Sequence, residues 1–268
     1  MARAGIEELL TPLLERAASV SDAGLALIDS LRSDDATVGT LPEATVFRLH
    51  LVATATYDSG ILCLRAPETS LGSYVLLRGL LEAWSHLAFI ADDAAGGDPR
   101  CRALRYERGA MREWSEVLKD APVYYDKVTW QAEHTSKERD LDALWREHRC
   151  SGSPRTWRQV SSTLRALAKE PMMEWIPGVW RATSAAVHMY GVDFVLRSRG
   201  GETELVWALP SQRATWLAFL VAAYGYVTAT AGAILSRGDS RIIQFHDSTR
   251  TFIEDDELNR ILRREYDG

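Results

Sequence analysis

Three polar residues of the types that catalyse phosphodiester cleavage lie on one predicted helix, in the stretch PGVWRATSAAVHMYG at 177–191. With 3.6 residues per turn, Arg181 and His188 lie about 20° apart around the helix axis, and Ser184 lies between them. An imidazole moves protons near pH 7, and a guanidinium binds phosphate through paired N–H groups. The pattern favours Arg181 as a phosphate ligand, His188 as an acid/base and Ser184 as the group that orients the imidazole. The structural alternative is a core histidine bonded to Ser184, with Arg181 on the surface.

A second polar group lies in the apolar stretch VLLRGLLEAWSH at 75–86. Arg78, Glu82 and Ser85 are spaced i, i+4 and i+7, so they share one face of a helix. Charged groups in so apolar a helix need partners when they are buried. We therefore expect this face to line the same site as the first polar group. The alternative is a structural ion pair between Arg78 and Glu82.

Two motifs resemble a family of uncharacterised helical proteins common in actinomycetes. The first is RGLLEAW at 78–84, followed by RALRYER at 102–108, and the second is WRATSAAVH at 180–188. Members of the family show an R-x-L-L-E-A helix and a later Y-R-x-x-S-x-x-x-H helix, whose tyrosine is Trp180 in this chain. The resemblance covers roughly residues 70–195. It implies an all-α fold in which the two motif helices are in contact.

The spacing of Arg181 and His188 also resembles the R-x6-H signature of the HEPN superfamily. Many of its members are dimeric, metal-independent RNases of toxin and anti-phage systems, in which these residues from two protomers face each other across a cleft. The resemblance implies a homodimer with RNA as substrate. Ala182 follows the arginine, where a polar residue is typical of the superfamily.

Metal-binding patterns are sparse. Asp92, Asp93 and Asp98 in the stretch ADDAAGGDP could hold Mg²⁺ through carboxylate oxygens, as in isoprenoid-type enzymes, although a solvated loop is the simpler interpretation. His134 and Glu138 are spaced i, i+4 on a polar helix, a pattern that could bind a metal but is more typical of a solvated face. We therefore expect no cofactor.

Composition and charge restrict the class of partner. The net charge of −6, from 31 basic and 37 acidic residues, argues against a broad nucleic-acid face and against DNA, but it allows a local basic site. Cys63, Cys101 and Cys150 are odd in number and far apart, and none is part of a C-x-x-C motif. This usage predicts no disulfide framework, no zinc site and a reduced, cytoplasmic location.

The hydrophobic periodicity is helical along almost the whole chain, which predicts a single all-α bundle over residues 1–268. The long helix expected at 211–236 carries no charge after its first turn, as a helix buried at the centre of a bundle does. A membrane span is the less favoured alternative. A minor β-hairpin near 195–208 and a short helix at 255–266 complete the prediction.

Three classes of function stay open. The first is a HEPN-like, metal-independent RNase or phosphodiesterase that uses Arg181 and His188. The second is a non-enzymatic helical module that binds a small anionic or aromatic ligand, or a partner protein, in a pocket between helices. The third is Mg²⁺-dependent isoprenoid chemistry at the three aspartates.

Overall fold

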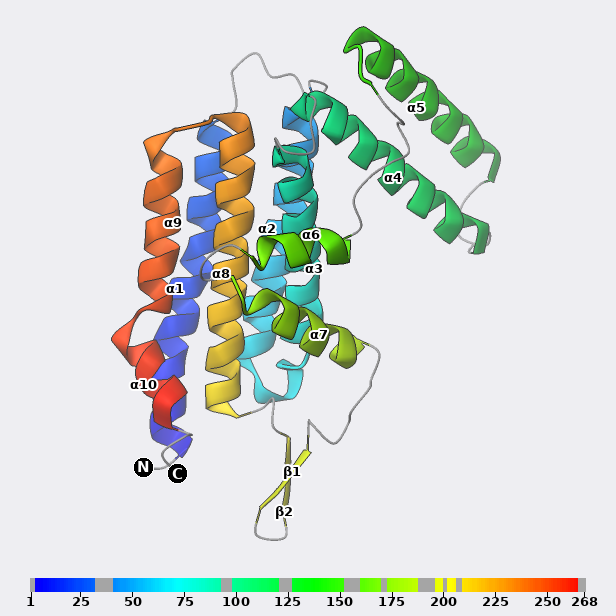
Figure 1. Ribbon diagram of the computed structural model, residues 1–268. Coiled ribbons are helices and arrows are strands. Elements are labelled where there is room, and N and C mark those ends of the chain that lie inside the picture. Colours follow the sequence, from blue (N-terminus) through cyan, green and yellow to red (C-terminus); the bar gives the residue numbers. More distant parts are fainter. Residues whose placement is uncertain are drawn as a thin grey trace.

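The computed structural model describes residues 3–31, 41–92, 98–120, 127–151, 160–169, 173–187, 196–199, 202–205 and 209–264. Long helices side by side form the body of the molecule (Figure 1), which confirms the predicted all-α bundle. They are α1 (Arg3–Ser30), α2 (Glu43–Arg65), α3 (Gly72–Ala91), α8 (Pro210–Leu235) and α9 (Ser240–Ile253), with the short α10 (Asp256–Arg264) at the end. A 3-10 turn (η1, Pro67–Thr69) connects α2 to α3.

Helix α8 is the central helix of the bundle. It packs against α1, α2, α3, α9 and α10, and buried residues such as Leu217, Leu220 and Tyr224 lie along it. Among the described residues, α8 is the one helix whose length and composition would allow it to cross a membrane, and over half of that stretch is buried in the protein. Helices that are apolar all round occur in both settings.

Two glycines let α8 and α9 approach closely. A Cβ added at Gly225 would lie 2.6 Å from Oγ1 of Thr249, and one at Gly232 would lie 2.9 Å from Cγ1 of Ile242. Both distances are shorter than van der Waals contact, so a side chain at either position would force the neighbouring side chain or helix to move.

A buried arginine forms hydrogen bonds to the last carbonyl groups of α2. The side chain of Arg213 is 2% exposed, and its guanidinium donates to the carbonyl oxygens of Leu64 and Arg65. It also donates to both carboxylate oxygens of Glu7 on α1, at 2.6 and 2.8 Å. The last carbonyls of a helix have no partner within the helix, so Arg213 both satisfies them and ties α1, α2 and α8 together.

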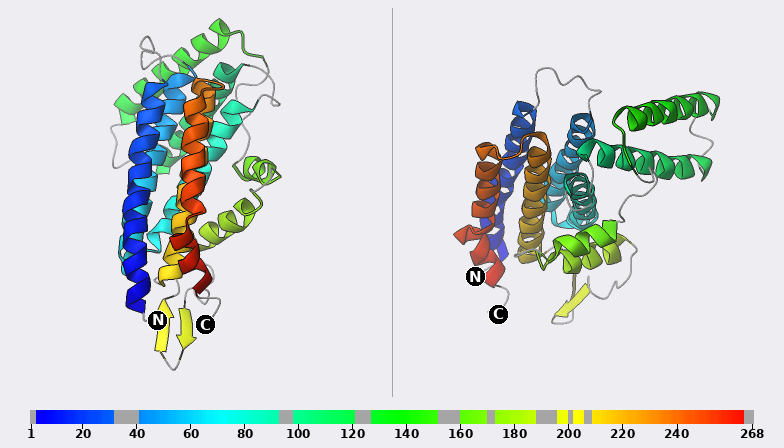
Figure 2. Two further views of the ribbon diagram at one scale, coloured as in Figure 1. Left: turned by 90° about the vertical axis from the view of Figure 1, so that its left-hand side faces the viewer. Right: turned by 45° about the horizontal axis from the view of Figure 1, so that its top comes forward.

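Helices α4 (Pro99–Asp120) and α5 (Lys127–Glu147) form an arm that projects from the bundle, as Figures 1 and 2 show. The first half of α4 packs against α3, and the buried carboxylate of Glu107 accepts hydrogen bonds from Thr45 and Arg48 of α2. A small separate core of Leu104, Met111 and Leu141 holds α4 to α5.

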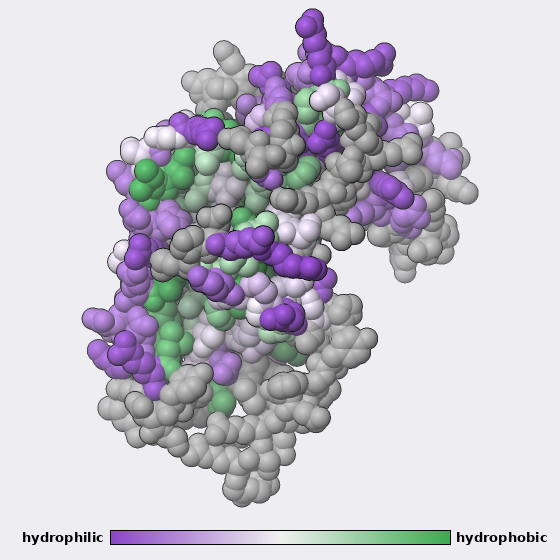
Figure 3. All heavy atoms as spheres, in the orientation of Figure 1, coloured by the Kyte–Doolittle hydropathy of each residue, from purple (hydrophilic) through white to green (hydrophobic). Residues whose placement is uncertain are grey.

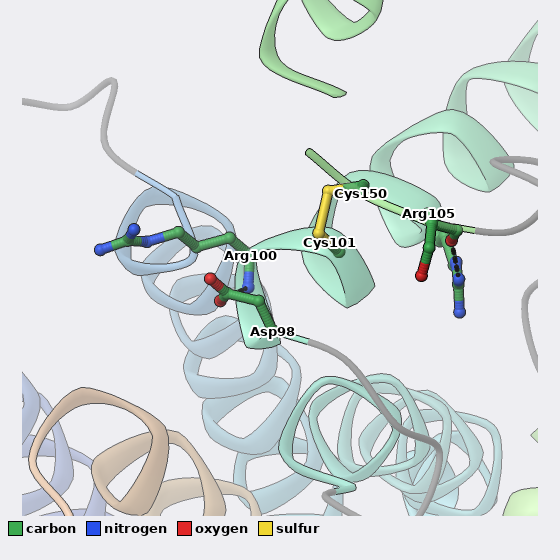
Figure 4. Close-up of a disulfide and its surroundings, with 6 residues drawn as sticks. Asp98, Arg100, Cys101, Arg105 and Cys150 are labelled. Carbon is green, nitrogen blue, oxygen red and sulfur yellow. Dashed lines mark hydrogen bonds between the residues drawn. A yellow bond between two sulfur atoms is a disulfide. The ribbon is translucent and has the colours of Figure 1, made fainter. Parts of the chain in front are cut away.

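The prediction that the cysteines form no disulfide is wrong. Cys101 at the start of α4 and Cys150 just after α5 are bonded to each other, with Cα atoms 5.6 Å apart (Figure 4). They are 49 positions apart, and the chain returns between them as the α4–α5 hairpin, which a spacing in sequence does not reveal. Disulfides persist mainly in oxidising compartments, so the cysteines no longer support a cytoplasmic location.

Helices α6 (Val160–Leu167) and α7 (Ile176–Val187) lie across the body of the bundle and both contact α3 (Figure 1). Strands β1 (Leu196–Arg199) and β2 (Glu202–Leu205) pair antiparallel, with Leu196 opposite Leu205. Residues 195, 200–201 and 206–208 of the expected hairpin lie outside the described residues, as do residues 265–266 of the expected terminal helix.

Candidate functional site

The two motif helices, α3 and α7, pack against each other and bring part of the predicted site together. Nε of Arg78 donates to Oε1 of Glu82 at 3.1 Å, and its Nη1 donates to Oγ of Ser184 at 3.4 Å. The guanidinium carbon lies 4.8 Å from the centroid of the Trp180 ring, within the range of a cation–π interaction. We refer to Arg78, Glu82, Trp180 and Ser184 as the α3–α7 cluster.

The α3–α7 cluster lies at the surface. The side chain of Arg78 is 26% exposed and that of Glu82 is 39% exposed, so the guanidinium keeps access to solvent while three groups hold it in place. Arg181, one residue after Trp180, is exposed, and Ser184 is half-buried. The polar stripe of α7 is therefore open to solvent over its described part.

The structure does not add two of the predicted residues to the α3–α7 cluster, for different reasons. His188 follows directly after the end of α7 and lies outside the described residues. Ser85 is only 1% exposed and belongs to the core, although it shares a helix with Arg78 and Glu82. The apolar surroundings of α3 bury its second half more deeply than its first.

The three aspartates considered as Mg²⁺ ligands are Asp92, Asp93 and Asp98, and the structure describes two of them. Asp98 caps α4, because its Oδ1 accepts a hydrogen bond from the backbone N–H of Arg100 at 2.9 Å (Figure 4). Asp92 follows the last residue of α3, and Asp93 lies outside the described residues. Nowhere in the described part of the chain do three or more His, Cys, Asp or Glu side chains form a group that could hold a metal ion.

A cavity of about 510 Å³ opens between α3, α6 and α8. One wall is an aromatic stack, in which the rings of Trp84 and Tyr226 are 4.8 Å apart and nearly parallel, at 10°. The side chains of Leu167 and Met173 add apolar surface, and Asp92 and Thr163 add polar groups. Burial raises the pKa of the Tyr226 phenol. Sequence reasoning missed this cavity because its walls come from three helices that are distant in the chain.

A second cavity, of about 390 Å³, lies on the arm between α4 and α5. It contains Ser115 and His134, whose Oγ and Nε2 atoms are 2.7 Å apart. Glu138 is the i+4 neighbour of His134, as the sequence suggested, and the two side chains are 3.9 Å apart. The partner that the sequence could not supply is Ser115, because it lies on the other helix.

Two further histidines lie within the bundle, His50 in its core and His86 half-buried on α3. His50 is fully buried, and its Nε2 lies 3.0 Å from Oγ1 of Thr228. Burial lowers the pKa of His50 to about 4, and it lowers the pKa of His86 to about 4 as well. Both imidazoles are therefore neutral at pH 7, which is typical of histidines with a structural role.

No protein-family model, curated protein or solved structure matches the chain. Functional arguments for this chain therefore depend on the chemistry of its own side chains. The α3–α7 cluster and the two cavities are the places where that chemistry is concentrated among the described residues.

Proposed function

We propose that the protein binds RNA or another phosphodiester at the α3–α7 cluster and cleaves it without a metal ion. Arg78 and Arg181 bind the phosphate, and His188 acts as the acid/base. The observation that carries the proposal is the position of Arg78, which is stacked on Trp180 and bonded to Ser184 on the helix that also presents Arg181 to solvent.

The contacts of Arg78 suit it to phosphate binding. Stacking on an aromatic ring fixes the plane of a guanidinium without using its N–H groups, so less rotamer entropy is lost when a phosphate binds. Glu82 takes up the Nε donor and leaves the outer face of the guanidinium at the partly exposed surface. An arginine prepared in this way forms paired hydrogen bonds to phosphate oxygens more readily than a free one.

The cleavage step uses an internal nucleophile. His188 accepts the proton of a ribose 2′-hydroxyl while that oxygen attacks phosphorus, and the bond from phosphorus to the 5′-oxygen breaks. The leaving oxygen takes a proton from an imidazolium, and the products are a 2′,3′-cyclic phosphate and a 5′-hydroxyl. Two copies of the chain would supply one imidazole for each role, so a homodimer forms part of the proposal.

The test is cleavage of end-labelled RNA in EDTA by the wild type, His188→Ala, Arg181→Ala and Arg78→Ala. We expect His188→Ala to lose about 10²-fold or more of the rate, because general acid–base catalysis contributes at least that much. Arg165→Ala on α6 is the matched control, since Arg165 is an exposed arginine outside the α3–α7 cluster. Equal cleavage by the wild type and a folded His188→Ala variant would contradict the proposal, and so would an absence of cleavage by both.

A second candidate function is the binding of a small aromatic ligand in the cavity beside Trp84 and Tyr226. The stacked rings offer a flat apolar wall, and a cavity of about 510 Å³ is within the range of small-molecule sites. Isothermal titration with aromatic carboxylates and aromatic amines would test it. Binding that is lost in Tyr226→Ala but kept in Trp114→Phe, on the arm, would support this function. If neither the carboxylates nor the amines produce heat of binding, this function is excluded.

A further inference from the structure

The cavity on the arm brings a hydroxyl, an imidazole and a carboxylate into one line. Oγ of Ser115 lies 2.7 Å from Nε2 of His134, and Nδ1 of His134 lies 3.9 Å from Oε2 of Glu138. A base within hydrogen-bond reach of a hydroxyl can activate a serine nucleophile, and a carboxylate near its other nitrogen can stabilise the charge that the base acquires. Glu138 is at ion-pair distance from His134, without a hydrogen bond between them. Neither fold nor sequence order restricts this arrangement, which is recognised by geometry alone.

Packing within the arm supports these groups from the side nearer the bundle. Ser115 is half-buried on α4, one turn after the buried Met111, and His134 is half-buried on α5. Met111 and Leu141 pack between the two helices, and the disulfide joins the start of α4 to the end of α5. The packing of Met111 and Leu141 beside the two residues, and the disulfide at the base of the arm, therefore keep α4 and α5 together where Ser115 and His134 meet.

Two arginines line the same cavity. Arg108, Arg112 and Ser115 follow one another at i, i+4 and i+7 on α4, so they share one face. Arg108 forms an ion pair with Asp142 of α5, yet its Nε is buried without a hydrogen-bond partner among the described residues. Arg112 is exposed at the mouth. In Figure 3 the visible face of the arm is mostly hydrophilic.

We propose that Ser115, His134 and Glu138 form a nucleophilic site that hydrolyses small carboxylic esters bearing a negative charge. Arg112 would pair with that charge, and Met111 forms the apolar floor. This site is separate from the α3–α7 cluster, and the proposal does not depend on the function suggested there.

The reaction balances with water as its second substrate. Oγ of Ser115 attacks the carbonyl carbon while Nε2 of His134 takes the hydroxyl proton, and the imidazolium then gives that proton to the departing alcohol oxygen. The ester C–O bond breaks, and an acyl group remains on Ser115. Water, deprotonated by His134, attacks this acyl group, which releases the acid and restores the hydroxyl. Glu138 stabilises the imidazolium through its charge.

One rotation of the hydroxyl prepares the site. In the structure Oγ of Ser115 lies 2.8 Å from the carbonyl oxygen of Met111, to which it can donate, as well as near His134. Nucleophilic attack requires the proton to point to Nε2 instead, with Nδ1–H directed at Glu138. Both acceptors of the hydroxyl proton are within hydrogen-bond distance, so this rotation needs no movement of the helices.

The test is covalent labelling by a fluorophosphonate, which forms a phosphonyl–serine bond and releases fluoride. We expect the full-length protein to be labelled and peptide mass spectrometry to place the adduct on Ser115. Labelling should disappear in Ser115→Ala and fall about 10²-fold or more in His134→Gln, since the imidazole is the base. The glutamine side chain keeps a hydrogen-bonding group at this position, and circular dichroism checks that each variant is folded.

Ser59→Ala is the matched control. Ser59 is exposed on α2 and, like Ser115, bonds the carbonyl oxygen four residues earlier, at 2.8 Å. We expect this variant to be labelled at Ser115 as fast as the wild type. A Ser115 that stays unlabelled, or that is labelled equally in the folded His134→Gln variant, would overturn the proposal.

The charge preference has its own readout. We expect p-nitrophenyl succinate to be hydrolysed faster than p-nitrophenyl butyrate, and we expect Arg112→Gln to remove the difference between them. Equal rates for the two esters in the wild type would overturn the assignment of an anionic substrate to this cavity.

Discussion

The guanidinium of Arg78 on α3 stacks on the indole of Trp180 on α7, with its central carbon 4.8 Å from the ring centroid. The two residues belong to sequence motifs about a hundred positions apart, and this contact is part of what joins the motifs. A cation–π contact at a partly exposed site contributes about 1 kcal/mol.

A double-mutant cycle measures this contact. We expect Arg78→Met and Trp180→Leu each to lower the free energy of unfolding in urea, with a coupling energy of about 1 kcal/mol between them. The control pair is Arg78→Met with Trp114→Phe, because Trp114 lies on the arm. A coupling energy near zero for the first pair would show that Arg78 and Trp180 do not interact.

Replacing Arg213 should strongly destabilise the bundle. Arg213→Met removes the donors to Leu64, Arg65 and Glu7. It leaves the buried carbonyl of Leu64 and the part-buried carbonyl of Arg65 without them, so we expect a loss of about 3–5 kcal/mol in the free energy of unfolding. Arg241 is the control, because it is exposed and pairs with Asp239 beside it in the chain. Arg241→Ala should change the free energy of unfolding little, because exposed ion pairs contribute little to stability. Similar losses for both variants would contradict the role assigned to Arg213.

His50 should make the protein less stable in mild acid. Its pKa is about 4 in the folded protein against 6.5 when unfolded, so the unfolded state binds a proton first as the pH falls below 6.5. The titration of His50 should therefore lower the free energy of unfolding by about 2 kcal/mol between pH 7 and 5. This loss should level off below pH 4, where His50 is protonated in both states.

Urea unfolding at the two pH values, for the wild type and His50→Gln, isolates that contribution. The glutamine can still hydrogen-bond Thr228, and it does not titrate. We expect the variant to lose about 2 kcal/mol less than the wild type over this range, with His86 accounting for part of the remainder. Identical pH dependence in both proteins would show that His50 is not buried in neutral form.

The disulfide should be detectable by thiol counting. Under denaturing conditions we expect one reactive thiol in the oxidised protein, that of Cys63, and three after reduction. Cys101→Ser/Cys150→Ser should lower stability by about 2–4 kcal/mol, since the bond joins residues 49 positions apart and closes a long loop. Hydrogen exchange should place the loss on α4 and α5, with Cys63→Ser as the control. Three free thiols in protein purified without a reductant would contradict the pairing.

Several features could be predicted from the sequence because they depend on neighbours within one helix. The 3.6-residue periodicity predicted the all-α bundle, and the long uncharged segment predicted a helix like α8, which lies at the centre. The spacing of Arg78 with Glu82 and of His134 with Glu138 predicted shared faces, because residues four apart are adjacent on any helix. The motif resemblance suggested that α3 and α7 meet.

Only the tertiary structure decided which residues on different helices contact each other. The pairing of Cys101 with Cys150, the contact of Ser115 with His134 and the burial of Arg213 all join residues whose distance in space is unrelated to their separation in the chain. Periodicity predicts the face of a helix but not the identity of the helix opposite, which depends on how all the apolar faces pack together at once. For that reason candidate residues could be read from the sequence one helix at a time, and the folded chain assembled them into sites.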